Sequence, residues 1–120
     1  MPAILIKRVY DLSAKEDGTR FLIDGLWPRG IKKEALQMEG WFKEIAPSAG
    51  LRRWFGHDPA KWEEFQKRYR AELGKHPEAC QTLLEAAQRG TITLLYSARD
   101  TDHNNAKALQ SYLEERLKRK

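Results

Sequence analysis

Three short runs of apolar residues predict the strands of this protein. The runs are "AILIKRV" at residues 3–9, "RFLID" at residues 20–24 and "TITLLYSA" at residues 91–98. Branched and large apolar side chains follow one another in each run with little interruption, rather than alternating with polar ones. Such runs are typical of parallel strands that are covered on both faces. We therefore expect a small, mainly parallel sheet of three or four strands, in which an edge strand or a dimer partner completes the three runs.

The segment between the second and third runs predicts two short helices first. Residues 34–46, "EALQMEGWFKEIA", place apolar side chains at helical intervals and are followed by Pro47, which ends a helix. Ser48 predicts a second short helix, because its hydroxyl can accept a hydrogen bond from the first turn. Gly56 predicts the end of that helix.

Three longer helices are predicted farther along the chain, beginning at Asp58, at Pro77 and near Asp102. The first start is the clearest, because an oxygen-bearing cap followed by proline favours helix initiation. Apolar residues then recur every three or four positions, which gives each helix one apolar face. About five helices and a small parallel sheet predict an α/β fold, a single layered domain over residues 1–120.

Composition narrows the class of protein. Of the 120 residues, 41% are hydrophobic and 10% are aromatic, which is enough for a core without metal or disulfide support. The single cysteine, Cys80, excludes an intramolecular disulfide and a Cys-x-x-Cys zinc site, and we expect it to be buried and inert. No apolar stretch approaches the about 18 residues of a membrane span or resembles a signal peptide. We therefore expect a cytoplasmic protein with no membrane contact, no metal and no cofactor.

The charge balance is basic. Lysine and arginine number 22 against 17 aspartate and glutamate residues, for a net charge of +5 and a pI near 9.4. A basic excess favours acidic partners such as nucleotides, phosphates or nucleic acid. Several of these charges lie in the terminal "RLKRK", where they can simply aid solubility.

Polar side chains follow each predicted strand. The three groups are Arg8, Tyr10 and Asp11; Asp24, Trp27, Arg29 and Gly30; and Tyr96, Ser97, Arg99, Asp100 and Asn104. If the strands are parallel, these groups meet at one edge of the sheet, where open α/β folds bind ligands. The connection between the first two strands is short for a parallel crossover. An antiparallel second strand, with the first group at the opposite end, is therefore the alternative.

The most distinctive of these segments is "DGLWPRG" at residues 24–30. Pro28 fixes its own backbone angle and restricts that of Trp27, so the indole and Arg29 are held with little freedom. A guanidinium suits phosphate or carboxylate, and an indole can stack on a base or a sugar. This segment therefore predicts one wall of a site for an anionic ligand. The alternative is that Trp27 packs in the core and Arg29 pairs with a nearby aspartate.

We predict that this site binds an anionic small molecule, such as a nucleotide or a phosphorylated metabolite. The predicted ligand-binding residues are Arg8, Tyr10, Asp24, Trp27, Arg29, Tyr96, Arg99, Asp100 and Asn104. If a reaction occurs, Asp24, His57 and Asp100 are the candidates for proton transfer. No nucleophile beside a base is evident, so binding ranks ahead of catalysis. Metal ligation by Asp100, Asp102 and His103 is a weaker alternative, because this spacing arises often by chance and Asp102 can cap the last helix.

Two further functions stay open at this point. The first is nucleic-acid binding by a basic surface that includes Lys32, Lys33, Arg52, Arg53 and the terminal "KRK". Two of these residues, Arg52 and Arg53, can instead line the predicted anion site or be solvated. The second is a structural or partner-binding role, in which the same motifs only build a core or a dimer contact. Either a monomer or a homodimer fits the sequence.

Six motifs in order carry a resemblance to a known family. They are "IKRVYD", "DGLWPRG", "APS", "LRRWFGHDP", "RYRAEL" and "TLLYSARD" followed by "NNA". In this order they resemble the YeaO-like family, a branch of domain of unknown function 488. The resemblance covers nearly the whole chain and implies a compact α/β domain of bacterial or archaeal cytoplasmic origin, with no established activity.

This chain departs from the family pattern at two places. Gly25 stands where the family usually has arginine, so one positive charge of the predicted site is missing. Residues 104–106 read Asn-Asn-Ala. Longer and more distant relatives of the family that this chain resembles have Cys-His-Arg near the start of the last helix. Thiol chemistry is therefore not expected here.

Overall fold

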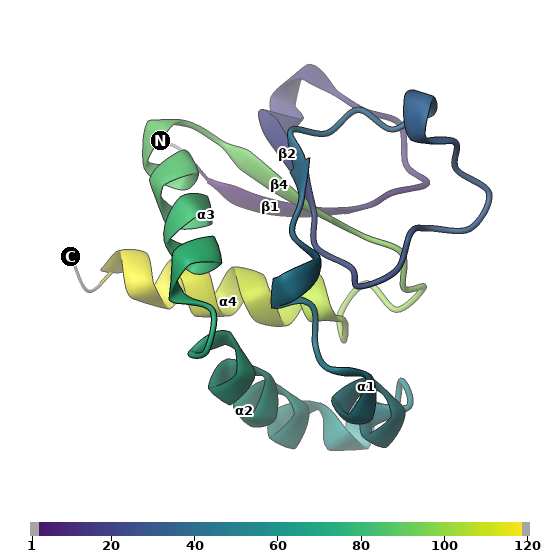
Figure 1. Cartoon of the computed structure of the whole chain (residues 1–120), viewed down its shortest axis with the longest axis vertical. Coiled ribbons are helices and arrows are strands. Elements are labelled where there is room, and N and C mark those ends of the chain that lie inside the picture. The colour runs from purple at the N-terminus through teal and green to yellow at the C-terminus, as the bar shows by residue number, and fades with distance from the viewer. Residues whose placement is uncertain (1–2, 119–120) are drawn as a thin grey trace.

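The computed structural model describes residues 3–118, which contain a four-stranded sheet flanked by helices (Figure 1). The strands are β1 (Ile4–Arg8), β2 (Thr19–Leu22), β3 (Gly40–Trp41) and β4 (Ile92–Tyr96). They lie in the order β1-β4-β2-β3, and every pair of neighbours is parallel. The predicted α/β class is confirmed, and the second strand runs parallel to the first.

The connection between β1 and β2 is short although the two strands are not neighbours. β4 lies between them and pairs with both. Residues 9–18 lead to β2, on the far side of β4, through one 3₁₀ turn, Lys15–Asp17, instead of a crossover helix. Gly18 then passes against the chain that enters β4, with φ +66°, and a Cβ at this position would lie 2.0 Å from the carbonyl oxygen of Thr91. Only glycine fits at this point.

Residues 3–118 form four α-helices, rather than the predicted five or so. They are α1 (Ala49–Phe55), α2 (Trp62–Leu73), α3 (Pro77–Arg89) and α4 (Asn105–Lys118). The predicted start signals of the first two are confirmed: the Ser48 hydroxyl accepts from the N–H of Leu51 at 3.1 Å. The Asp58 carboxylate accepts from the N–H of Ala60 at 3.0 Å, in a 3₁₀ turn that leads into α2.

The predicted helix at residues 34–46 is wrong. This segment forms the 3₁₀ turns Lys33–Ala35 and Lys43–Ile45, with β3 between them. Glycine at position 40 weakens a helix by about 1 kcal/mol relative to alanine. Pairing with β2 replaces the helical hydrogen bonds, since the N–H of Phe42 donates to the carbonyl of Leu22 at 2.9 Å. Tertiary contacts therefore outweigh the helical spacing of the apolar residues.

The predicted cap of the last helix is also wrong. α4 begins after Asn104, whose side-chain oxygen accepts from the N–H of Lys107 at 2.8 Å. Asp102 lies in the preceding turn and is exposed. Both residues are of types that favour a cap, so the sequence did not distinguish them.

The sheet is covered differently on its two faces. The helices lie on one side of it, and the long connection from β2 to β3, drawn in blue, extends on the other (Figure 1). Alternate residues of β4 divide accordingly: Leu94 and Tyr96 join the main core beneath the helices, whereas Leu95 joins a smaller cluster with Leu22 and Leu36. Both faces are thus buried, as the apolar runs predicted, although one is covered without helices.

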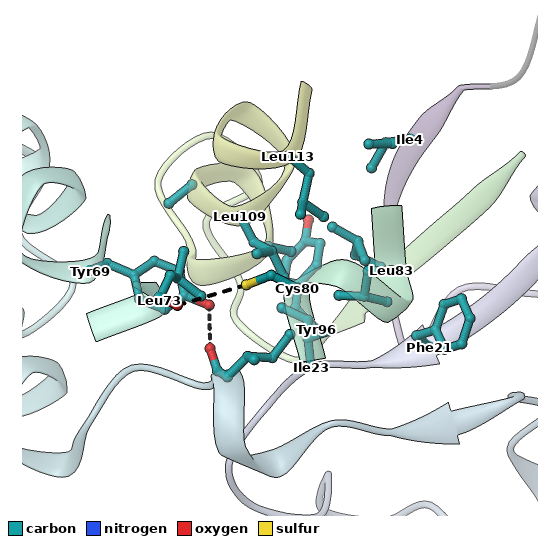
Figure 2. Packing of buried hydrophobic residues seen from close by; sticks show 14 of the residues in the cluster. Ile4, Phe21, Ile23, Tyr69, Leu73, Cys80, Leu83, Tyr96, Leu109 and Leu113 are labelled. Atoms are coloured by element: carbon teal, nitrogen blue, oxygen red, sulfur yellow. Dashed lines mark hydrogen bonds between the residues drawn. The ribbon is translucent and has the colours of Figure 1, made fainter. Parts of the chain in front are cut away.

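The main core consists mostly of buried apolar side chains (Figure 2). The hydroxyl of Tyr69 donates to the carbonyl of Ile45 at 2.6 Å, which satisfies a polar group that is fully buried. Cys80 is buried beside Leu73, and burial raises the pKa of its thiol. A raised thiol pKa disfavours the reactive thiolate.

Candidate functional site

A hollow of about 710 Å³ lies beyond the carboxyl ends of the strands, between them and helices α1, α2 and α4. We call it the strand-end pocket. Its lining residues are Tyr10, Asp24, Gly25, Leu26, Trp27, Pro28, Arg29, Pro47, Arg52, Phe55, His57, Phe65, Ser97, Ala98, Arg99, Asp100, His103, Asn104 and Asn105. Most of the predicted site residues therefore line one hollow, because parallel strands end at the same edge of the sheet.

Asp24 joins the segments that follow β2 and β4. Its Oδ2 accepts from the backbone N–H of Ser97 at 2.9 Å and from the Ser97 hydroxyl at 2.7 Å. Its Oδ1 accepts from the side-chain amide of Asn105 at 2.8 Å, in the first turn of α4. The carboxylate is thus occupied by internal donors, which makes Asp24 a positioning residue for the pocket.

Asp100 organises the turn before α4 in a similar way. Its Oδ1 accepts from the backbone N–H groups of Asp102 and His103, at 2.9 and 3.0 Å, and its Oδ2 lies 3.0 Å from Nδ1 of His103. The hydrogen bond from the backbone of Asp102 is the main cause that lowers the pKa of Asp100. Asp100 is therefore ionised at neutral pH, and it orients the His103 imidazole in the pocket wall.

Three arginines of the pocket have free guanidinium groups. Arg29 follows β2, Arg52 lies in α1 and Arg99 follows β4, and all three are exposed. None of them forms an ion pair or a side-chain hydrogen bond within residues 3–118. The sequence alternative in which Arg29 pairs with an aspartate is thus not what the structure shows. The pocket instead offers unpaired cationic donors from three separate elements.

Two of the predicted ligand residues lie outside the pocket lining. Tyr96 points into the main core and is 2% exposed, because the side chains of β4 alternate between the two faces of the sheet. Arg8 donates to the carbonyl oxygens of Ala98 and Ser97, at 2.9 and 3.2 Å, so its guanidinium is already bonded.

Arg8 braces the two loops that carry the free arginines. Its guanidinium carbon lies 4.9 Å from the ring centre of Tyr10. The Tyr10 hydroxyl donates to the backbone carbonyl of Arg29 at 2.9 Å. Through these contacts and its bonds to Ser97 and Ala98, Arg8 connects the segment after β2 with the segment after β4.

Trp27 combines the two interpretations of its motif. Its indole packs edge-on against Trp41, with 5.4 Å between the ring centres, and its N–H donates to the carbonyl of Ile31 at 2.6 Å. The core interpretation of this residue therefore holds. Trp27 still forms part of the pocket wall, next to the buried Pro28 and the exposed Leu26.

His57 lies on the pocket wall just after α1. It is exposed, and with φ +56° it has the only positive φ of a non-glycine residue within residues 3–118. Its ring lies 6.4 Å from that of Phe55, measured between the ring centres. Strained backbone of this kind is found more often at functional sites than elsewhere.

Sequence reasoning gave Ser97, His103 and Asn105 no ligand-binding role, and it left open whether Arg52 and Arg53 line the site or are solvated. Arg52 and Arg53 are adjacent and equally charged, so only the rotation of α1 decides which of them faces the pocket. His103 lies three residues after Asp100, a spacing at which an aspartate can orient a following side chain across one turn. That spacing was the available signal.

Neither a metal-binding cluster nor a membrane-spanning helix is found in the described residues. No group of three His, Cys, Asp or Glu side chains in residues 3–118 is arranged to hold a metal ion. No helix of that part of the chain has the length and apolar character needed to cross a membrane.

The chain is similar to one protein family and to uncharacterised bacterial proteins of nearly the same length. Residues 3–120 match a family described as "Inactive DUF488-N3 subclade". The chain is 44% identical to "Uncharacterized protein YeaO" of Escherichia coli (strain K12), over 92% of this chain and 96% of that protein. It is 34% identical to "Uncharacterized protein Rv3073c" of Mycobacterium tuberculosis (strain ATCC 25618 / H37Rv), over 92% of each chain. No solved structure shows significant similarity to the chain.

Proposed function

Since the chain belongs to the YeaO-like family, in the subclade of DUF488 proteins described as inactive, we propose that it binds an anionic small molecule in the strand-end pocket. The ligand is a nucleotide or a phosphorylated metabolite. The observation that carries the proposal is that three arginines without an ion pair or side-chain hydrogen bond in residues 3–118, Arg29, Arg52 and Arg99, line one hollow. Guanidinium groups bind phosphate and carboxylate oxygens through charge-assisted hydrogen bonds.

The occupied carboxylates support this proposal. An acidic group inside an anion site would ordinarily compete with the ligand for the arginines. Asp24 and Asp100 instead receive three hydrogen bonds each from neighbouring protein groups. The guanidinium donors are therefore left for a molecule from solution.

Binding ranks ahead of catalysis in this proposal for a chemical reason. A serine nucleophile is normally activated by an imidazole or another base of suitable pKa. The Ser97 hydroxyl donates instead to the carboxylate of Asp24, which also accepts two N–H donors. The description of the subclade as inactive supports the same ranking.

The proposal is tested by the double variant Arg29→Ala/Arg99→Ala. Binding of a panel of nucleotides and sugar phosphates is measured by isothermal titration calorimetry, with thermal unfolding as a check of the fold. We expect an affinity loss of at least about tenfold, because each charge-assisted hydrogen bond contributes about 1.5–3 kcal/mol. The melting temperature should change little, since both side chains are exposed and unpaired.

The control is Arg89→Ala, which removes another exposed arginine at the end of α3, away from the pocket lining. It should bind like the natural protein. If the double variant unfolds or loses a dimer, the arginines are structural. If no mono- or polyanion of the panel binds the natural protein, the proposed function is wrong.

The dependence of binding affinity on salt concentration distinguishes the nucleic-acid alternative from this proposal. Lys32, Lys33 and Arg53 are exposed, Arg52 faces the pocket, and residues 119–120 of the terminal "KRK" lie outside the described residues. Phosphate contacts along a nucleic acid make affinity fall steeply with salt. Under our proposal, short DNA and RNA show no binding near about 150 mM salt. Tight binding with a steep salt slope would favour the alternative.

A further inference from the structure

We infer that the ligand of the strand-end pocket carries at least two adjacent phosphate groups attached to an organic group, as nucleoside diphosphates and triphosphates do. This inference rests on the proposed function and specifies its ligand class. Three independent features of the pocket point to it: the number of free cationic groups, the oriented imidazole and the apolar wall.

The first feature is the distribution of positive charge. Arg29, Arg52 and Arg99 come from three separate segments of the chain, and all three line the hollow. A carboxylate has two oxygens at one point and can pair with one planar guanidinium in a bidentate manner. Two further free guanidinium groups would then repel each other without a partner. A diphosphate chain spreads its charged oxygens over a greater length, so it offers acceptors to more than one guanidinium group.

The second feature is the imidazole of His103. Because Nδ1 lies 3.0 Å from Asp100, the tautomer and the direction of the ring are fixed by that carboxylate. Nε2 is the ring nitrogen that has no partner within residues 3–118. The ring is also held edge-on to Trp62, with 5.4 Å between the ring centres. An ionised Asp100 places the ring proton on Nδ1, so Nε2 of the neutral ring is an acceptor that can receive a hydrogen bond from a hydroxyl group on the organic part of the ligand.

The third feature is the space that an inorganic anion would leave empty. The hollow of about 710 Å³ falls within the range of pockets that hold whole organic ligands. Leu26, Pro47, Phe55 and Phe65 give it an apolar side, and Leu26 is 68% exposed. A free phosphate or pyrophosphate has no use for such a wall, whereas a base or a sugar can cover it.

A series of ligands that differ in the number of phosphate groups and in the organic group tests the inference. Adenosine, AMP, ADP, ATP and inorganic pyrophosphate are titrated into the natural protein by calorimetry, at constant ionic strength and with EDTA present. We expect no measurable binding of adenosine, an affinity at least about tenfold higher for ADP than for AMP, and weaker binding of pyrophosphate than of ADP.

The outcomes separate this inference from the proposed function. Equal affinities for AMP, ADP and ATP, or binding of a monocarboxylate such as benzoate in preference to all of them, would overturn the inference and leave an anion site in place. Pyrophosphate binding as tightly as ADP would overturn the role of the organic group. Absence of binding by every anion would overturn the proposed function as well.

A matched pair of variants locates the effect. Arg52→Ala removes a guanidinium of the pocket, and Arg53→Ala removes its exposed neighbour on α1, which does not line the pocket. We expect Arg52→Ala to weaken ADP binding at least about tenfold and to reduce the ratio of ADP to AMP affinity. Arg53→Ala should change neither. Equal losses in the two variants would mean general attraction to a basic surface and would overturn the inference.

Discussion

The Asp24 carboxylate illustrates how much one residue contributes to the pocket. It accepts from the N–H and the hydroxyl of Ser97 and from the side chain of Asn105, while its backbone carbonyl accepts from the indole of Trp41 at 2.6 Å. Sequence reasoning placed Asp24 correctly after a strand and considered it for ligand binding and proton transfer. It had no means to count these internal donors, because they come from residues 17 to 81 positions away.

Removing this carboxylate should destabilise the protein more than removing one of its partners. Asp24→Ala leaves the N–H of Ser97 and the amide of Asn105 without an acceptor, so we expect a loss of about 2–4 kcal/mol in the free energy of unfolding. Ser97→Ala removes only the hydroxyl bond and should cost about 1 kcal/mol. Urea denaturation measures both variants. Equal losses would show that the carboxylate does not hold the two segments together.

Whole elements were predictable where the local signal and the tertiary contacts agree. β1, β2 and β4 fall within one or two residues of their apolar runs, and the caps at Ser48 and Asp58 mark real helix starts. The helix predicted at residues 34–46 does not form, because the apolar side chains of this segment pack in two separate cores. Leu36 is buried in the smaller cluster and Ile45 in the main one, and a straight helix cannot reach both.

The connection between β1 and β2 provides a test at this scale. Gly18→Ala should cost at least about 3 kcal/mol, since the new Cβ meets the backbone of Thr91 and φ is positive. Gly30→Ala is the matched control, because Gly30 has φ +78° but no atom within 4 Å of a Cβ position. The strain alone should cost about 1–2 kcal/mol. Similar melting temperatures for the two variants would contradict the close approach at Gly18.

The dependence of stability on pH is a property of the whole molecule, and one buried cluster contributes to it. Asp17 is 4% exposed, and its carboxylate lies 2.9 Å from Nζ of Lys7 on β1 and 3.0 Å from the guanidinium of Arg20 on β2. Burial alone would raise the pKa of Asp17. The hydrogen bonds from Lys7 and Ala14, with the charges of Lys7 and Arg20, outweigh it and hold the pKa below its usual value.

A lowered pKa in the folded state gives a defined sign. The contribution of Asp17 is fully present above the pKa of an unfolded aspartate, about 4, and is lost as the pH falls through the lower native value. We expect Asp17→Asn to be less stable than the natural protein at pH 7, and the two stability curves to converge at acid pH. Urea denaturation between pH 2.5 and 7 measures this. A constant difference over that range would contradict an ionised, stabilising Asp17.

The order of the strands has a consequence for biosynthesis. The strand between β1 and β2, β4, is the last of the four strands in residues 3–118 to be translated, and β1 and β2 do not pair with each other. During synthesis, β1 cannot pair with its neighbour in the sheet until residues 92–96 have been made. Pairing over such a sequence separation is slow. The sheet, and the pocket at its edge, therefore assemble late, when most of the polypeptide has already emerged.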